Sequence, residues 1–378
     1  MTDDLPPHPA LLPSGLRDLL PPEAETEAAA VAALMAVFAS HGYQRVKPPL
    51  LEFEDGLLTG AGAAITDQTF RVMDPDTHRM MGLRADMTPQ VARIASSRMA
   101  AQPRPLRLSY AGQCLRVRAV APMPDRQLAQ AGIELIGADS PDADAETVLV
   151  AAEALAALGL TRISVDLTMP PLAPALLDAA GLTGAARQTM TRALDRKDAA
   201  VVAAQGGPIA PLLTQLLLVA GPADTALDAL ARLDLPPAAA ALCDRLRATV
   251  VAIRCRAPSL RLTLDPIEFR GFRYHTGVCA TIYAPGRHEE LGRGGRYVSG
   301  DEPATGITLF PDAVLRACPV AAPRPRAFLP HGTAPDIAAQ LRHQGFATVA
   351  ALTDHDDAAR LGCSHTVRDG QAVPVSGD

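Results

Sequence analysis

Several short stretches of the chain alternate apolar and polar residues, a period of two that predicts strands with one buried face. In 163–168, for example, Ile, Val and Leu alternate with Ser, Asp and Thr. A strand along 83–88 would place Arg84, Asp86 and Thr88 on one face. The same reasoning predicts strands at 70–73, 83–88, 106–118, 127–137, 163–168, 260–264, 278–283 and 305–309.

A helical period dominates the other parts of the chain. A first helix is expected from Glu23 to His41, because acidic residues fill its first turns and Gly42 follows its end. The two prolines at 48 and 49 then suit an edge strand, which could pack against a second copy of the chain or be a plain surface connection. Further helices, separated by Gly and Pro, are expected at 90–100, 142–158, 173–180, 185–194, 209–219, 223–233 and 238–253.

These elements predict an α+β fold with a helical insertion, for which 378 residues are sufficient. The core domain is expected to comprise 1–169 and 258–318, interrupted by an all-helical insertion at 170–257. A Pro- and Ala-rich linker at 319–327 leads to a small C-terminal α/β unit at 328–378, whose pattern is strand, helix, strand.

Composition narrows the classes of function. A formal net charge of −6 argues against binding nucleic acid through bulk positive potential, although a local basic groove stays open. The six cysteines include no Cys-x-x-Cys pair, which is typical of a reduced cytosolic protein and gives no zinc signature. The chain begins without the pattern of a secretory signal, and its longest apolar run is too short to span a bilayer. We therefore expect a cytoplasmic protein without a metal site, whose partners are small molecules or proteins.

Residues 269–277 carry the most unusual polar pattern, Phe-Arg-Gly-Phe-Arg-Tyr-His-Thr-Gly. As a strand, this stretch would place Arg270, Phe272, Tyr274 and Thr276 on one face. A buried guanidinium needs an anion, so Arg270 implies either a structural carboxylate partner or an anionic ligand. The pattern alone leaves both open.

Two other stretches combine polar residues with glycine. Gln130 and Glu134 are four residues apart in the expected strand 127–137, so they share a face, with Gly132 between them. That glycine could leave room for a ligand or mark a β-bulge. The run at 291–297, Leu-Gly-Arg-Gly-Gly-Arg-Tyr, matches neither the Rossmann nor the P-loop pattern, so its glycines predict close backbone packing rather than a phosphate cradle.

Taken in order, these motifs resemble the class II aminoacyl-tRNA synthetases, and specifically their histidyl-tRNA synthetase branch. The resemblance covers most of 11–317 and implies the fold of that class, an antiparallel sheet flanked by helices, with a homodimer formed through the first motif. The residues that carry it are Pro-Ser-Gly-Leu-Arg-Asp-Leu-Leu-Pro at 13–21, the first motif at 42–52, Leu-Arg-Ala-Asp-Met-Thr at 83–88, the second motif around 112–116, 130–134, and Arg-Gly-Phe-Arg-Tyr-His at 270–275.

The resemblance also implies a pocket for histidine. Asp86, which stands where the synthetases have Glu, and Thr88 would contact the α-amino group, while Arg270 would face the carboxylate. Aromatic side chains would surround the imidazole, together with His275, where the family usually has a second Tyr. The implied histidine-binding set is Asp86, Thr88, Arg116, Gln130, Glu134, Arg270, Tyr274, His275 and Tyr297. Glu134 could instead simply pair with Arg270.

The departures from the synthetase pattern concern ATP. Where the second motif of the synthetases reads Phe-Arg-x-Glu, this chain reads Leu-Arg-Val-Arg, which keeps Arg116 and loses the Glu. In the third motif, Ala313 stands where the family has the Arg that clamps the nucleotide, and Pro311 interrupts the run. Amino-acid activation needs cationic stabilisation of the phosphate, so these losses predict no adenylation. The C-terminal unit is also shorter than an anticodon-binding domain, which needs about 90 to 100 residues.

A kept amino-acid pocket with a dismantled ATP site is similar to the regulatory subunits of ATP phosphoribosyltransferase. That family works with a short-form catalytic subunit, which joins ATP to phosphoribosyl pyrophosphate in the first step of histidine biosynthesis. The similarity implies a non-catalytic chain without a cofactor, which activates the catalytic subunit, mediates allosteric feedback by histidine and forms a homodimer within a hetero-oligomer. No tRNA or membrane partner is expected.

Two alternatives stay open. The chain could be a divergent histidyl-tRNA synthetase, which histidine-dependent ATP–pyrophosphate exchange would reveal. It could also be a free-standing synthetase paralogue that uses the pocket for another ligand.

Overall fold

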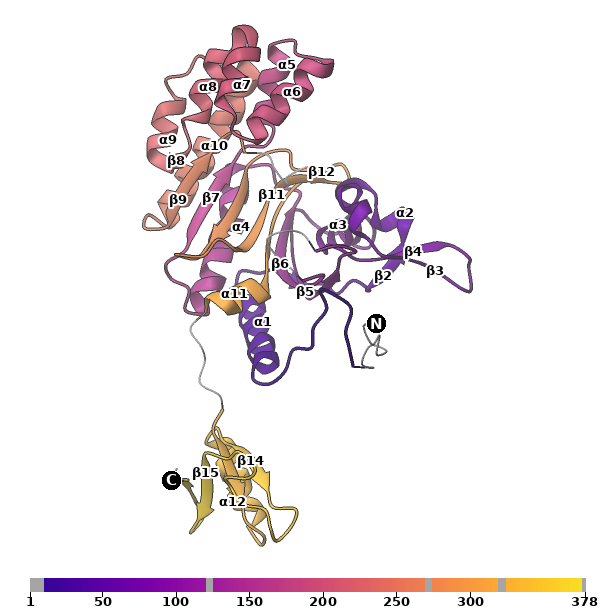
Figure 1. The fold of residues 1–378 in the computed structure, drawn as a ribbon, viewed down its shortest axis with the longest axis vertical. Coiled ribbons are helices and arrows are strands. Elements are labelled where there is room, and N and C mark those ends of the chain that lie inside the picture. The colour runs from indigo at the N-terminus through magenta and orange to yellow at the C-terminus, as the bar shows by residue number, and fades with distance from the viewer. Residues whose placement is uncertain (1–9, 120–124, 269–273, 319–323, 376–378) are drawn as a thin grey trace, which may run out of the picture. The chain divides into compact units, whose positions relative to one another are not determined.

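The computed structural model describes residues 10–119, 125–268, 274–318 and 324–375, and divides into two compact units, Met1–Pro319 and Val320–Asp378. The strands of the larger unit's main sheet are β1 (Gln44–Arg45), β5 (Leu106–Leu115), β6 (Gln127–Ile136), β7 (Ser164–Thr168), β8 (Gly221–Pro222), β9 (Arg261–Asp265), β10 (Cys279–Tyr283), β11 (Glu290–Ser299) and β12 (Glu302–Leu309). They form a nine-stranded sheet in the order β1-β5-β6-β12-β11-β10-β7-β9-β8 (Figure 1). Two outer pairs, β1–β5 and β7–β9, are parallel, and the central strands are antiparallel.

Three helices pack against one face of this sheet. They are α1 (Glu23–Ser40), α4 (Pro141–Ala157) and α11 (Pro311–Ala317) (Figure 1). Helix α1 buries Leu34 and Phe38, and acidic residues in its first turn suit the helix dipole. Helix α4 begins after Ser140, whose Oγ accepts a hydrogen bond from the backbone N–H of Ala143 at 3.1 Å. These helices cover the apolar core of the unit.

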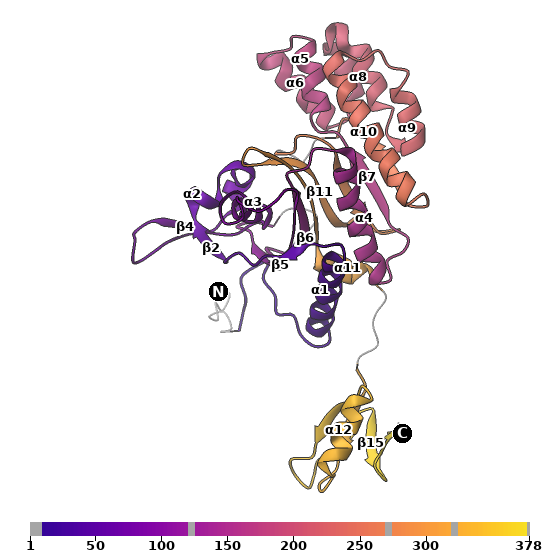
Figure 2. The ribbon, with the colours of Figure 1, turned by 180° about the vertical axis from the view of Figure 1, so that it is seen from behind.

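The other face of the main sheet carries a smaller layer. It consists of β2 (Leu51–Phe53), α2 (Glu54–Leu57), η1 (Gly60–Gln68), β3 (Arg71–Met73), β4 (Met80–Leu83) and α3 (Thr88–Ser97), with strand order β2-β4-β3. Figure 2, in which the molecule is turned by 180° from Figure 1, shows its elements α2, α3, β2 and β4. The predicted strand at 83–88 is wrong beyond Leu83, because the chain bends there and Thr88 starts α3. The segment with two prolines is likewise divided, since β1 joins the main sheet and β2 the small one.

The helical insertion lies between β7 and β9 (Figure 1). Its helices are α5 (Leu172–Ala179), α6 (Gly184–Asp195), α7 (Ala199–Gln205), η2 (Gly207–Ile209), α8 (Ala210–Leu217), α9 (Ala223–Leu230) and α10 (Pro237–Arg256). Helix α7 was not predicted from the sequence. The prediction of an all-helical insertion is also wrong, because the short β8 pairs with β9 and extends the main sheet. Helix α10 packs along α4. No helix in the described ranges has the length and apolar character needed to cross a membrane.

The C-terminal unit has its own small sheet and apolar clusters. Its elements are β13 (Arg326–Leu329), α12 (Pro335–His343), β14 (Ala347–Ala350), β15 (His365–Arg368) and β16 (Gln371–Pro374). Strands β13 and β14 are parallel around α12, as the strand-helix-strand pattern predicts. An antiparallel hairpin, β15–β16, adds two strands that the sequence did not indicate.

The predictions for the stretches 269–277 and 291–297 have different outcomes. Residues 269–273, and with them Arg270 and Phe272, lie outside the described residues. Tyr274 occupies a turn and the following residues reach no strand before Cys279, so the strand predicted there is wrong for 274–277. The run at 291–297 lies within β11, and close packing of its glycines is confirmed: a Cβ on Gly294 would lie 2.0 Å from the carbonyl oxygen of Gly306 in β12.

Candidate ligand-binding site

A buried carboxylate, Glu134, stands at the centre of the main sheet. It belongs to β6 and is only 1% exposed. Thr88 at the start of α3 donates its hydroxyl to Oε1 at 2.9 Å, and Tyr297 of β11 donates its hydroxyl to Oε2 at 2.9 Å. Tyr110 of β5 donates to Oε1 at 3.4 Å. Three elements, α3, β11 and β5, thus bring neutral hydrogen-bond donors onto one acid of β6.

Glycines make space for these side chains. A Cβ on Gly306 of β12 would lie 1.8 Å from Oε2 of Glu134. A Cβ on Gly132 would lie 2.5 Å from the Tyr110 hydroxyl, because Tyr110 is the residue directly opposite in β5. The space beside Gly132 is therefore filled by Tyr110, which corrects the expectation of room for a ligand there. The β5–β6 register is also unbroken, so the alternative of a bulge is wrong.

The protonation of Glu134 follows from its surroundings. Burial raises the pKa of this carboxyl to about 8, and the hydrogen bonds from Thr88 and Tyr297 oppose that shift only in part. The charge of a second carboxylate, Asp86, raises the pKa further. At neutral pH the carboxyl is therefore mostly protonated, and a cation placed beside it would favour the ionised form.

Gln130 shapes the turn that carries Asp86 and Thr88. Its side-chain oxygen accepts hydrogen bonds from the backbone N–H of Met87 at 3.0 Å and from the Cys114 thiol at 3.2 Å. Asp86 Oδ1 accepts from the backbone N–H of Thr88 at 3.3 Å. The structure therefore brings the predicted Asp86, Thr88, Gln130 and Glu134 together, although the first two share a turn and not a strand face.

Three aromatic rings lie in succession, beginning with Tyr297, which bonds to the carboxylate. Tyr274 stacks on His275, with ring centroids 4.2 Å apart, and meets the edge of Tyr297 at 6.0 Å. Burial, together with the positive charge of Arg293, lowers the pKa of His275 to about 3, so its imidazole is neutral at physiological pH. The predicted Tyr274, His275 and Tyr297 are thus neighbours, while the position of Arg270 lies outside the described residues.

Arg116 follows the end of β5 and is 8% exposed. Its Nε donates to the carbonyl oxygen of Ala85 at 3.5 Å, a long hydrogen bond. Burial lowers the pKa of its guanidinium, and the negative charge of Asp86 opposes that shift. The only strong cation of the predicted set that the structure describes therefore lies on the Asp86 side of the site.

Sequence reasoning missed two members of this cluster, Tyr110 and Thr308. The Tyr110 hydroxyl lies 2.7 Å from Thr308 Oγ1 and 3.4 Å from Thr88 Oγ1. The available signal was a tyrosine placed opposite a glycine once β5 and β6 are paired. Burial raises the pKa of Tyr110 well above its usual value, so this hydroxyl stays neutral.

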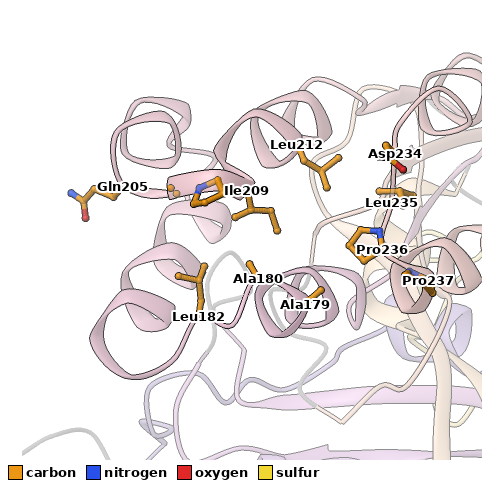
Figure 3. A pocket seen from close by; sticks show the side chains of 13 residues that line it. Ala179, Ala180, Leu182, Gln205, Ile209, Leu212, Asp234, Leu235, Pro236 and Pro237 are labelled. Carbon is orange, nitrogen blue, oxygen red and sulfur yellow. The ribbon is translucent and has the colours of Figure 1, made fainter.

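One cavity borders the cluster of side chains around Glu134, and a second lies apart from it. One of about 500 Å³ is bordered by Tyr274, Pro89 and Val298, and Tyr274 also meets the edge of Tyr297. The other, about 620 Å³, lies within the helical insertion, where Ile209 and Leu235 are among its apolar lining residues (Figure 3). None of the predicted site residues lines the second cavity. In the described ranges, no three His, Cys, Asp or Glu side chains gather to hold a metal ion.

Comparisons with known proteins identify this architecture. A sequence model of the histidyl-tRNA synthetase family matches residues 15–314. A relative named ATP phosphoribosyltransferase regulatory subunit, from Gluconobacter oxydans, is 54% identical over 373 residues, which cover 98% of each chain. A second relative of the same name, from Paramagnetospirillum magneticum, is 56% identical over 361 residues, covering 94% of this chain and 95% of that one.

Solved structures show the same fold. The chain is similar to an ATP phosphoribosyltransferase regulatory subunit/histidyl-tRNA synthetase from Bacillus halodurans, with a TM-score of 0.80 at 23% identity over 94% of this chain and 96% of that one. Fold and sequence together define a chain of the class II, histidyl-tRNA synthetase-like architecture, which confirms the predicted fold class. Within that class, the chain belongs to the family of ATP phosphoribosyltransferase regulatory subunits.

Proposed function

We propose that this chain is the non-catalytic subunit of an ATP phosphoribosyltransferase complex, that it activates a short-form catalytic subunit, and that histidine acts through it as a feedback inhibitor. The observation that carries the proposal is the buried Glu134 with its three neutral donors. A protein places such an acid in its interior at a cost, which a cationic ligand offsets. The relatives' shared name supplies the complex in which this ligand would act.

Histidine has the groups that this site would recognise. Its α-ammonium would lie beside Glu134 and Asp86 and would favour the ionised form of Glu134. Its imidazole would meet the rings of Tyr274 and Tyr297, and its carboxylate would face Arg116 or Arg270. The neutral His275 imidazole adds a hydrogen-bonding group without an opposing positive charge. These roles are proposals that the arrangement of the described side chains supports.

The residue at the position of the synthetases' nucleotide-binding arginine, Ala313, supports a non-catalytic role. Ala313 is buried in α11 among apolar neighbours of the main core, so this position supplies no positive charge. The neighbouring Asp312 instead accepts a hydrogen bond from the backbone N–H of Ala129 at 3.0 Å. A carboxylate here opposes triphosphate binding, because like charges repel in a partly buried site.

The decisive assay is the rate of phosphoribosyl-ATP formation by a short-form catalytic subunit, with and without this chain, across a histidine titration. We expect stimulation by the chain that histidine reverses. Glu134→Gln should weaken the response to histidine and retain complex formation. The matched control is Glu146→Gln. Glu146 lies on α4 and pairs with Arg107 of β5, and this variant should respond to histidine as the wild type does. No stimulation by the wild-type chain would overturn the proposal, and pyrophosphate exchange would then test for a synthetase.

We also propose a homodimer within the complex. The small sheet exposes Met73 of β3 and Met80 of β4, which lie directly opposite each other, and Leu50 of the first motif is also exposed just before β2. Exposed large apolar side chains that gather on a surface are typical of an interface. Light scattering should give twice the mass of one chain, and replacing Met73 and Met80 by Glu should give monomers. A monomeric wild-type chain would contradict this part of the proposal.

A further inference from the structure

A buried pair of opposite charges lies on the far side of β11 from Glu134. Arg296 precedes Tyr297, so the two side chains point to opposite faces of the sheet. Arg296 and Asp144, in the first turn of α4, have side chains that are only 6% and 3% exposed. Asp144 Oδ1 accepts from Arg296 Nε at 2.9 Å and lies 2.7 Å from Nη2. Arg296 Nη1 donates to the carbonyl oxygen of Ala138 at 3.0 Å, which fixes the guanidinium further.

The helical insertion shares this ion pair. Arg245 of α10 donates to the other oxygen of Asp144, from Nε at 3.2 Å and from Nη2 at 3.0 Å. Its Nη1 donates to Asp139 Oδ1 at 2.8 Å, and the same oxygen lies 3.3 Å from Arg296 Nη1. Two arginines from distant parts of the chain therefore share two carboxylates at the start of α4. The four charges balance, and each Asp144 oxygen holds one arginine.

Arg296 is also fixed to the ring segment of the candidate site. Its backbone carbonyl accepts from the N–H of Thr276 at 2.8 Å, and its own N–H donates to the carbonyl of Val278 at 2.9 Å. These bonds hold the residues directly after Tyr274 and His275. A displacement of Arg296 would thus move the ring segment and, through Tyr297, the hydrogen bond to Glu134.

We propose that Arg245 is a positioning residue of the candidate ligand site, acting through Asp144 and Arg296. The inference rests on the proposed function for the identity of the ligand, histidine. A buried ion pair has few acceptable geometries, so removing Arg245 leaves one Asp144 oxygen without its partner and an excess negative charge at the start of α4. The Arg296 guanidinium then shifts toward a new position, and β11 shifts with it. By linkage, a ligand that binds against the ring segment must in turn stabilise the contact of α10 with α4.

Arg245→Met tests this, with Arg254→Met as the matched control. Arg254 lies on the same helix and is also paired, with Asp224 at 3.2 Å and with the carbonyl of Leu260, and none of its hydrogen bonds within the described residues reaches α4. We expect Arg245→Met to bind histidine about 3- to 30-fold more weakly by calorimetry, a range set by typical coupling through packed networks. Arg254→Met should bind as the wild type does, and Arg245→Lys should fall between.

Hydrogen exchange gives a readout that a loss of stability alone would not produce. Histidine should slow amide exchange along 237–256 in the wild type and in Arg254→Met, but not in Arg245→Met. Equal histidine affinity of the Arg245→Met and Arg254→Met chains, with equal protection of α10, would overturn the inference.

A double-mutant cycle decides the coupling without any ligand. Tyr297→Phe and Arg245→Met together should change the unfolding equilibrium constant by a factor that departs at least about threefold from the product of the single effects. A purely multiplicative result would overturn the link between α10 and the site. If the wild-type chain does not bind histidine, the proposed ligand is wrong. The double-mutant cycle would still test the coupling between Arg245 and Tyr297, because it needs no ligand.

Discussion

Glu134 should dominate the pH dependence of stability between mildly acidic and alkaline pH. Its pKa is about 8 in the folded chain against an ordinary 4.5. Between those values the folded state holds a proton that the unfolded state has released, so the free energy of unfolding falls as pH rises, by about 1.4 kcal/mol per pH unit. Ionising this acid completely therefore costs the folded state about 5 kcal/mol. Glu134→Gln keeps one oxygen that accepts from one of the Thr88 and Tyr297 hydroxyls, its amide nitrogen can donate to the other, and it cannot ionise.

The assay is the free energy of unfolding in urea for the wild type and Glu134→Gln, at about pH 5.5 and pH 8.5. Relative to the variant, the wild type should lose about 3 kcal/mol over this interval, since part of the total effect lies below pH 5.5. Glu146→Gln is the control, because the pKa of Glu146 is lowered and this acid stays ionised throughout. A difference between wild type and Glu134→Gln that does not change with pH would refute the reasoning.

The same protonation predicts a signature of ligand binding. An ammonium beside Glu134 favours the carboxylate, so histidine should release close to one proton from the mostly protonated acid near pH 7. Calorimetry in two buffers of different ionisation enthalpy measures this number directly. Glu134→Gln should release none, and a wild-type value of zero would show that the ligand's amino group lies elsewhere.

Three further predictions concern individual features. Gly306→Ala should destabilise the chain by about 2 to 4 kcal/mol, because its Cβ would overlap Glu134, whereas Gly221→Ala, with open space around it, should cost less than about 1 kcal/mol in urea unfolding. His275 has a pKa of about 3, so the folded state resists its protonation and loses stability as pH falls below about 6.5; relative to the wild type, His275→Gln should gain about 2 kcal/mol between pH 7.5 and pH 5. A chain ending at Pro319 should keep a cooperative thermal transition, since the main unit has its own core, and a broad, non-cooperative melt would contradict this.

The sequence predicted two of the strands that build the site, β5 and β6, but not β11, which carries Tyr297. The residues of β5 alternate clearly, and once β6 is also a strand, Gln130 and Glu134 must share a face. What alternation cannot supply is the partner across the sheet. Gly132 left open either room for a ligand or a bulge, because Gln130 and Glu134 lie two residues away on either side, but the pairing of β5 with β6 sets Tyr110 directly opposite and fills that space.

The turn at Asp86 shows a second limit. Polar residues at 84, 86 and 88 have the period of a strand, yet Pro89 lies in the first turn of α3, where its fixed φ is favourable, and the helix begins at Thr88. The hydrogen bond from Met87 N–H to Gln130 then stabilises the bend. That bond joins residues 43 positions apart, so no local pattern could indicate it. Strands β8 and β15–β16 were missed for the same reason, because short segments become strands only through their partners.

The burial of Glu134 bears on how the candidate site would respond to a ligand. Three neutral hydroxyls solvate Glu134, and together they lower its pKa by less than burial raises it. On the opposite face of the sheet, Asp144 is paired with Arg296 and Arg245. Among the described residues, the hydrogen-bond donors to Glu134 are neutral, so an arriving ammonium would offset much of the about 5 kcal/mol that ionising this acid costs the folded state. Free energy of that size exceeds the 1 to 3 kcal/mol that allosteric coupling usually needs, so ligand binding here could both hold its ligand and shift a partner between two states.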